Sequence, residues 1–196
     1  MIARQFLWHE CRTRTFLLRS LWGNKADLSL SGGVNVTQAS KNSSKLEDNL
    51  LTKDLPAAVA YIESLERRHD ASVAFMLDNC GLELLSDLLF AHALTGAGIR
   101  VTLHCKFWPT FVSDATADDI NIHLDWIKQV SNQGKRLAEQ IRREIVKSNI
   151  RTYAHSFYNT PCPMEDMPKD LMEKLAQDDL CILKGDGEDS LLPKMK

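Results

Sequence analysis

The strongest constraint on the fold is the alternation of short, continuously apolar segments with longer segments of helical periodicity. The expected strands are bounded by turn residues and cover residues 73–77, 100–105, 110–112 and 180–183. The expected helices cover residues 56–68, 82–94, 118–147 and 168–176, the third being one long or two shorter helices with Gly134 as the break. Buried strands joined by helices form parallel sheets that are covered on both faces. We therefore predict an α/β fold with a mostly parallel sheet.

The length and composition fit one globular domain. The chain has 196 residues, of which 44% are hydrophobic and 26% are charged, as in an ordinary α/β domain. Its formal net charge of −2 gives no electrostatic reason to expect nucleic acid or a membrane as a partner. No apolar segment reaches the roughly 18–20 residues that a membrane span requires. Five widely spaced cysteines without a C-x-x-C pair favour a reducing compartment, so we expect a cytoplasmic protein.

The N-terminal region permits two interpretations. Residues 1–22 contain four arginines and one acidic residue, as mitochondrial presequences do. Their apolar residues also fit an amphipathic helix that packs on the domain, which is the interpretation we favour. We divide the chain into an N-terminal helix with an adjoining motif at 1–31, a flexible loop at 32–54 and the main domain at 55–196, since Ser, Asn, Gly and Thr are abundant in 32–49.

Polar side chains follow the ends of the expected strands. Asp78 and Asn79 come directly after the first strand, and Asp114 and Asp186 follow later ones. Because the carboxyl ends of parallel strands meet at one edge of the sheet, where ligands bind, we expect these side chains to converge. Carboxylates brought together repel one another unless a cation neutralises them, and carboxylate and amide oxygens suit Mg²⁺ or Mn²⁺. Glu83, one turn into the next helix, is placed to orient a water or to contact a substrate hydroxyl.

Each of these residues also has a purely structural interpretation. Asp or Asn after a strand often caps the next helix, which applies to residues 78–79 and 113–114. Asp186 fits an acidic turn. Gly96 and Gly98 precede a strand instead of following one, so we expect them to end a helix and not to bind phosphate. The six histidines show no H-x-x-x-H spacing, which argues against zinc.

Four separated motifs carry a more specific signal. They are Leu-Trp-Gly-Asn-Lys-Ala-Asp-Leu-Ser-Leu-Ser-Gly-Gly at 21–33, Leu-Asp-Asn-Cys-Gly-Leu-Glu-Leu at 77–84, Lys-Phe-Trp-Pro-Thr-Phe-Val-Ser-Asp-Ala-Thr at 106–116 and Leu-Lys-Gly-Asp at 183–186. In this order they resemble the metal-dependent damage-control phosphatases, a family whose eukaryotic branch is also called acidic residue methyltransferase. The resemblance covers residues 21–186, almost the whole chain.

The resemblance implies a fold, a metal and a substrate class. The fold would be a Rossmann-like three-layer α/β/α sheet, which we expect to be incomplete in a shortened form. Mn²⁺ or Ni²⁺, with Co²⁺ and Mg²⁺ as further options, would be held by Asp78, Asn79 and Asp114, and Asp78 and Asp114 would be the catalytic groups. The reaction would be hydrolysis of small sugar phosphates such as fructose 1-phosphate and fructose 6-phosphate, which makes residues 55–196 a partial metal-binding phosphatase domain. The residues expected to bind substrate are Asp78, Asn79, Glu83, Lys184 and Asp186.

The chain departs from the family pattern after the last motif. The family continues Lys-Gly-Asp as Leu-Asn-Tyr-Arg, whereas this chain has Gly-Glu-Asp-Ser at 187–190, and the family's later Arg-Thr-x-Lys motif is absent from the sequence. We therefore expect the metal ligands to be kept and much of the phosphate clamp to be lost. Three functions compete: a metal-dependent sugar phosphatase, an S-adenosylmethionine-dependent carboxyl methyltransferase and a catalytically impaired interaction fragment. The first is favoured over the second because Asp-Asn-Cys-Gly-Leu-Glu, and not a glycine-rich cofactor loop, follows residues 73–77.

Overall fold

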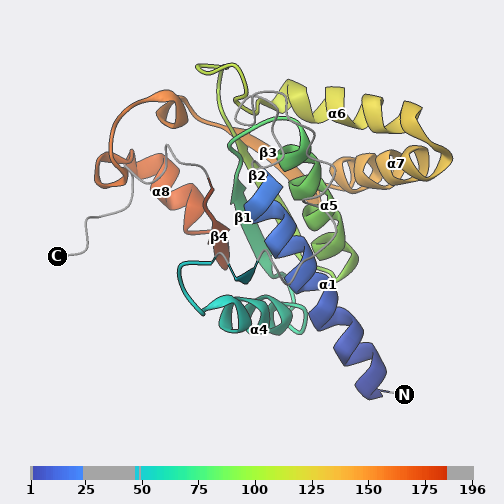
Figure 1. The fold of residues 1–196 in the computed structure, drawn as a ribbon. Coiled ribbons are helices and arrows are strands. Elements are labelled where there is room, and N and C mark those ends of the chain that lie inside the picture. The colour runs from blue at the N-terminus through green and yellow to red at the C-terminus, as the bar shows by residue number, and fades with distance from the viewer. Residues whose placement is uncertain (1, 24–46, 49, 185–196) are drawn as a thin grey trace.

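Four parallel strands form a single sheet in the order β3-β2-β1-β4 (Figure 1). The computed structural model describes residues 2–23, 47–48 and 50–184. Along the chain the helices and strands are α1 (Ile2–Trp22), α4 (Leu55–Leu65), β1 (Ser72–Met76), α5 (Leu82–Gly96), β2 (Arg100–Cys105), α6 (Ala117–Val130), α7 (Asn132–Val146), β3 (Ile150–Ala154), α8 (Lys169–Leu175) and β4 (Leu180–Ile182), with 3-10 turns at Ser156–Asn159 and Met164–Asp166. The predicted α/β class is confirmed, and the sheet with its flanking helices is consistent with a Rossmann-like α/β/α fold.

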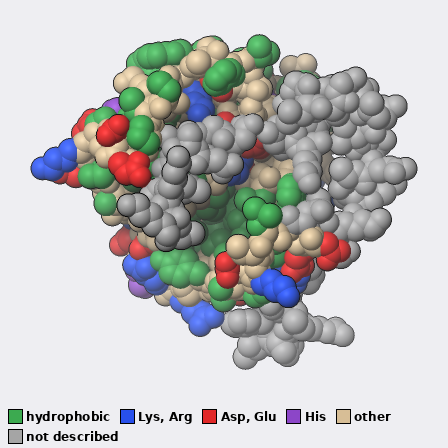
Figure 2. All heavy atoms as spheres, turned by 60° about the vertical axis from the view of Figure 1, so that its left-hand side comes forward, with side chains coloured by type: hydrophobic (Ala, Val, Ile, Leu, Met, Phe, Trp, Pro, Cys, Tyr) green, Lys and Arg blue, Asp and Glu red, His purple; other side chains and the backbone are tan. Residues whose placement is uncertain are grey.

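The main hydrophobic core lies between the sheet and the helices that pack on it. Side chains alternate along a strand, so Val73 and Phe75 of β1 and Leu103 of β2 enter this core together with Leu84 and Leu88 of α5. In Figure 1, α1, α5 and α7 lie on one side of the sheet and α8 lies beside β4 on the other. Figure 2, which brings the β4 and α8 side forward, shows hydrophobic side chains in a recess between charged ones.

Helix α1 packs on the domain, as the amphipathic interpretation predicts. Leu17 and Leu18 are buried in the core. Phe16 stacks on Phe90 of α5 with ring centroids 6.2 Å apart, and Phe90 meets Phe75 of β1 edge to face at 5.4 Å. Phe90 therefore links the N-terminal helix to the central strand. None of the described helices combines the length and the apolarity that crossing a membrane requires.

Local signals explain where several elements begin and end. Helix α5 stops before Gly98, whose φ of +87° lies in the left-handed region that favours glycine, so the predicted helix stop is confirmed. Helix α6 begins with a capping box in which Thr116 and Asp119 each bind the other's backbone. Ser131 caps α7 by accepting a hydrogen bond from the Gly134 backbone at 3.0 Å.

Two predictions about secondary structure were wrong, and one strand was missed. The long helical segment breaks at Ser131 and not at Gly134, which lies inside α7. A Cβ atom at Gly134 would lie 2.3 Å from the Ile127 carbonyl oxygen, so this glycine permits close packing of α6 on α7. Residues 110–112 form bends and turns instead of a strand. Strand β3 was not predicted. The other elements match their predicted positions with ends displaced by a few residues.

Candidate functional site

Two segments that follow strands β1 and β2 lie side by side at the carboxyl edge of the sheet. The Ala115 amide donates to the Asp78 carbonyl oxygen at 2.8 Å, and the Cys80 amide donates to the Ser113 carbonyl oxygen at 2.7 Å. These bonds flank an antiparallel bridge between Asn79 and Asp114. The backbone itself therefore holds together the two segments that carry Asp78, Asn79 and Asp114. That their side-chain oxygens share one ion stays a prediction.

The side chains of this edge are partly or fully buried and bind one another. Asn79 Nδ2 donates to Asp78 Oδ2 at 2.6 Å and to Glu83 Oε2 at 3.2 Å, while its Oδ1 accepts from Ser113 Oγ at 2.6 Å. Asp78 and Asp114 are 9% and 5% exposed. Asn79 thus joins the Asp78 and Glu83 carboxylates, which would otherwise repel each other.

These residues are not helix caps, which corrects the structural alternative. The N-cap of α5 is Gly81, with no side-chain capping bond, and the N-cap of α6 is Thr116. Asp114 instead organises the loop before it, because its Oδ2 accepts hydrogen bonds from the amides of Thr110 at 2.8 Å and Phe111 at 2.9 Å. Both bonds use Oδ2, so the carboxylate can offer Oδ1 to a ligand.

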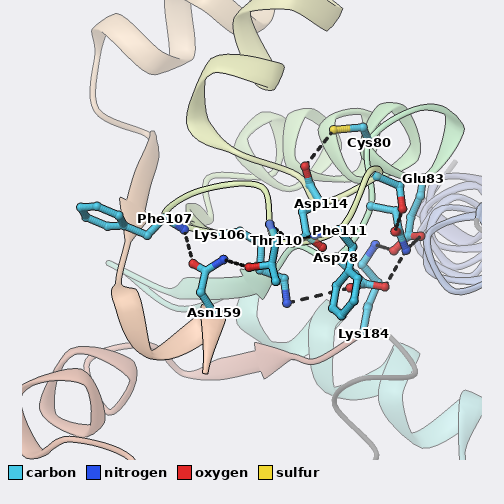
Figure 3. Close-up of polar contacts among 12 residues, drawn as sticks. Asp78, Cys80, Glu83, Lys106, Phe107, Thr110, Phe111, Asp114, Asn159 and Lys184 are labelled. Carbon is cyan, nitrogen blue, oxygen red and sulfur yellow. Dashed lines mark hydrogen bonds and ion pairs between the residues drawn. The ribbon is translucent and has the colours of Figure 1, made fainter. Parts of the chain in front are cut away.

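A second anchor holds the same loop from the far side. Asn159 accepts from the Phe107 amide at 2.8 Å and donates to Thr110 Oγ1 at 2.8 Å (Figure 3). It also donates to the Trp108 carbonyl oxygen at 2.6 Å. Phe107, Trp108 and Phe111 are nevertheless exposed. The loop is therefore fixed in its backbone while it presents aromatic rings to the solvent beside the acidic edge.

Two lysines supply positive charge near the site. Lys106 Nζ lies 4.0 Å from Asp78 Oδ1. Lys184 Nζ donates to Glu83 Oε1 at 2.8 Å and also binds Asp87, and its side chain is only 3% exposed. Lys184 was expected to contact substrate, and in the structure two buried carboxylates already hold its ammonium group. Asp186, the remaining predicted substrate residue, lies outside the described residues.

Electrostatics distinguish two further groups near the edge. Burial, assisted by the nearby Asp119 carboxylate, raises the pKa of the Cys80 thiol to about 12. The thiol therefore stays protonated and donates to the Asp114 carbonyl oxygen at 3.3 Å, which does not suit a nucleophile. Burial also raises the pKa of Asp87 to about 6, although Lys184 and the Ser20 hydroxyl lower it.

The side chains at this edge include the ligand types that a hard divalent cation needs. Asp78, Asn79 and Asp114 supply carboxylate and amide oxygens, the ligand types that Mn²⁺ and Mg²⁺ accept. Within the described part of the chain, no three His, Cys, Asp or Glu side chains are already grouped as a metal site. The Asn79 amide nitrogen faces Asp78, and turning the amide over would face its oxygen toward the same carboxylate, an arrangement that a cation between them would stabilise. The residue types fit, with a side-chain rotation at Asn79 required.

Sequence reasoning assigned no role to Asp87, Ser20 or Asn159. Asp87 follows Glu83 by four residues in α5, a spacing that places both carboxylates on one helix face and could have suggested a pair. Ser20 and Asn159 are separated from their partners by 67 and about 50 residues in the chain, and no local pattern signals them.

Comparison with known proteins places the chain in a family. A family model described as the damage-control phosphatase ARMT1-like domain matches residues 4–190. The chain belongs to this family. Damage-control phosphatase ARMT1 of Xenopus laevis is 32% identical over 182 residues, and the proteins of the same name from Macaca fascicularis and Homo sapiens are 33% and 31% identical over 180 residues. In each case the alignment covers 85% of this chain and 41% of the relative. The chain thus spans about two fifths of the length of the relatives that it matches.

Proposed function

We propose that this chain is a metal-dependent phosphomonoester hydrolase that acts on small sugar phosphates of the fructose 1-phosphate type. The observation that carries the proposal is the backbone bridge between Asn79 and Asp114, because it brings Asp78, Asn79 and Asp114 to one edge of the sheet. Membership of the damage-control phosphatase family supports the reaction class. Mn²⁺ or Ni²⁺ is the proposed metal, with Co²⁺ or Mg²⁺ as substitutes.

Each side chain of the site has a proposed task. A divalent cation bound by Asp78, Asn79 and Asp114 would supply Lewis acidity at a phosphoryl oxygen. The Asp78 and Asp114 carboxylates hold negative charge at fixed positions, and the two amide bonds to Asp114 keep its orientation. Lys106, 4.0 Å from Asp78, offsets part of the negative charge and lies close enough to attract a phosphate. The substrate would then sit against these groups at the carboxyl edge of the sheet.

The methyltransferase alternative has less support. An S-adenosylmethionine enzyme of this fold class usually binds its cofactor on a glycine-rich loop after the first strand. Here β1 is followed by Asp78 and Asn79, which bind each other and Glu83. Such a cluster of anionic and amide groups suits a cation better than an adenosine.

A metal panel tests the proposal. The metal-stripped protein would be incubated with fructose 1-phosphate and with Mn²⁺, Ni²⁺, Co²⁺ or Mg²⁺ in turn, and released phosphate would be measured. We expect release that depends on added metal and is abolished by a chelator. Phosphate release at the level of the metal-free blank with every cation would refute the proposed function, and methyl transfer from S-adenosylmethionine to a glutamate peptide would favour the alternative.

A further inference from the structure

A chain of buried polar contacts runs from helix α1 to the candidate metal site. Ser20 Oγ donates to Asp87 Oδ1 at 2.5 Å, and Asp87 Oδ2 accepts from Lys184 Nζ. Lys184 Nζ also donates to Glu83 Oε1 at 2.8 Å. The other oxygen of Glu83, Oε2, accepts from Asn79 Nδ2 at 3.2 Å. Each contact uses a separate carboxylate oxygen, so the contacts form one path from Ser20 to Asn79.

The charged members of this path are withdrawn from solvent. The side chains of Lys184, Glu83 and Asp87 are 3%, 5% and 1% exposed. Buried charges persist only where partners neutralise and hydrogen-bond them. Lys184 meets this need with two carboxylates on the same face of α5, and Figure 3 shows it next to Glu83. A lysine held in this way is a buried counter-ion of both carboxylates.

Backbone packing holds Glu83 from another direction. A Cβ atom at Gly23, directly after α1, would lie 2.6 Å from the Glu83 Cα atom. The end of α1 therefore lies against the backbone of Glu83, while Ser20 of the same helix binds Asp87. Helix α1 thus contacts both carboxylate residues of α5.

We propose that Asp87 is a positioning residue that acts through Lys184 and Glu83 to set the direction of the Asn79 amide. Asp87 occupies one donor of the Lys184 ammonium and keeps it on Glu83 Oε1, which leaves Oε2 to Asn79. Without the Asp87 charge, the ammonium would be drawn to both oxygens of Glu83 and would compete with the Asn79 amide. The effect of Asp87 on a reaction rests on the proposed function, whereas its effect on the Asn79 amide does not.

The test compares D87N with the native chain. The substitution keeps the shape of the side chain and removes its charge. The first measurement is the ¹⁵N–¹H resonance of the Asn79 side-chain amide, assigned by its disappearance in N79D. We expect this resonance to move in D87N. We also expect Mn²⁺ affinity to rise, because the Asn79 amide must turn away from Glu83 Oε2 before its oxygen can face a cation. D125N, an equal change of charge at an exposed ion pair with Arg142, should move neither.

A second variant covers the case in which D87N does not fold. S20A removes only the hydroxyl bond to Asp87 and keeps every charge, so we expect a smaller shift of the Asn79 resonance in the same direction. An unchanged Asn79 resonance in the folded variants, with only a lower melting temperature, would overturn the positioning role. A native chain that releases no phosphate with any metal would refute the proposed function instead, and the resonance would still decide the role of Asp87.

Discussion

At Asp78, one carboxylate carries much of the negative charge that a cation at the sheet edge would need. Its Oδ2 accepts from Asn79 at 2.6 Å and its Oδ1 lies 4.0 Å from Lys106 Nζ. Asp78→Asn preserves shape and removes the charge. We expect Mn²⁺ affinity in calorimetric titration to fall at least about tenfold and metal-dependent phosphate release to be lost, with a small change in melting temperature. Native affinity in the variant would contradict the assignment of Asp78 as a ligand.

His104 gives the described domain a pH dependence that is separate from the site. Its imidazole is 1% exposed, its Nδ1 lies 2.6 Å from the Tyr158 hydroxyl, and burial, with a smaller effect of Lys174, lowers its pKa to about 4. In the unfolded chain the pKa is near 6.5, so the unfolded state binds the proton first as pH falls. The contribution of His104 to the free energy of unfolding is therefore fully present above about pH 6.5. It falls by about 3 kcal/mol as pH falls towards 4.

Urea unfolding at several pH values measures this effect. The free energy of unfolding of the native chain should fall between pH 7 and pH 4.5 by more than that of His104→Gln, which has no titrating group at the position. A difference between the two proteins that stays constant over this range would show that His104 does not titrate as its burial implies.

At the scale of elements, the loop of residues 106–114 connects aromatic side chains to the candidate ligand Asp114. Asn159→Ala removes three hydrogen bonds that hold this loop to the Ser156–Asn159 turn. We expect a looser loop, a shifted Trp108 fluorescence and metal affinity lowered by about tenfold, because Asp114 would lose part of its preorganised support. Thr160→Ala, which removes only a local bond to the Phe157 carbonyl oxygen, is the matched control. Equal metal affinity in both variants would limit Asn159 to a structural role.

The elements that sequence reasoning predicted are those with strong local signals. Strand β1 is buried at every position, so its apolar run is continuous. Strand β3 lies at the sheet edge and exposes Arg151 and Thr152, so it has no apolar run to detect. The sequence predicts a helix break at Gly134, whereas this glycine lies inside α7 and makes room for Ile127 of the neighbouring helix. No local pattern contains that contact.

The candidate site also contains residues that the sequence predicts and residues that it does not. The positions of Asp78 and Asn79 follow from their place directly after β1, because the topology of a parallel sheet brings strand ends together. Asp114 does not follow the strand expected at 110–112, and its bridge to Asn79 places it at the same edge. The burial of Lys184 was not predictable, since it depends on Asp87 and Glu83, about 100 residues away in the chain. Side-chain partners across such separations are set by how the helices pack, and a single sequence does not record that packing.

At the scale of the whole molecule, the balance of charge around the sheet edge limits the expected rate. Phosphoryl transfer depends on positioning and on cations that stabilise the transferred group. Two carboxylates hold Lys184. Lys106 is the lysine that lies beside a candidate ligand in the described structure, with its Nζ 4.0 Å from Asp78 Oδ1. The segment 187–190 reads Gly-Glu-Asp-Ser where the family resemblance leads us to expect an arginine, so it adds negative charge.

Under the proposed function, we expect this chain to release phosphate more slowly than the longer damage-control phosphatase ARMT1 of Xenopus laevis, of which it covers 41%, when both are assayed with fructose 1-phosphate. Loss of one preorganised electrostatic contact commonly lowers a rate by about 10²–10³, and kcat/KM should differ by at least that factor at equal metal loading. Replacing residues 187–190 with Leu-Asn-Tyr-Arg should recover part of the difference by restoring one cation. Equal kcat/KM for the native chain and the relative would show that the arginine is dispensable and that the metal ligands with Lys106 suffice for phosphate transfer.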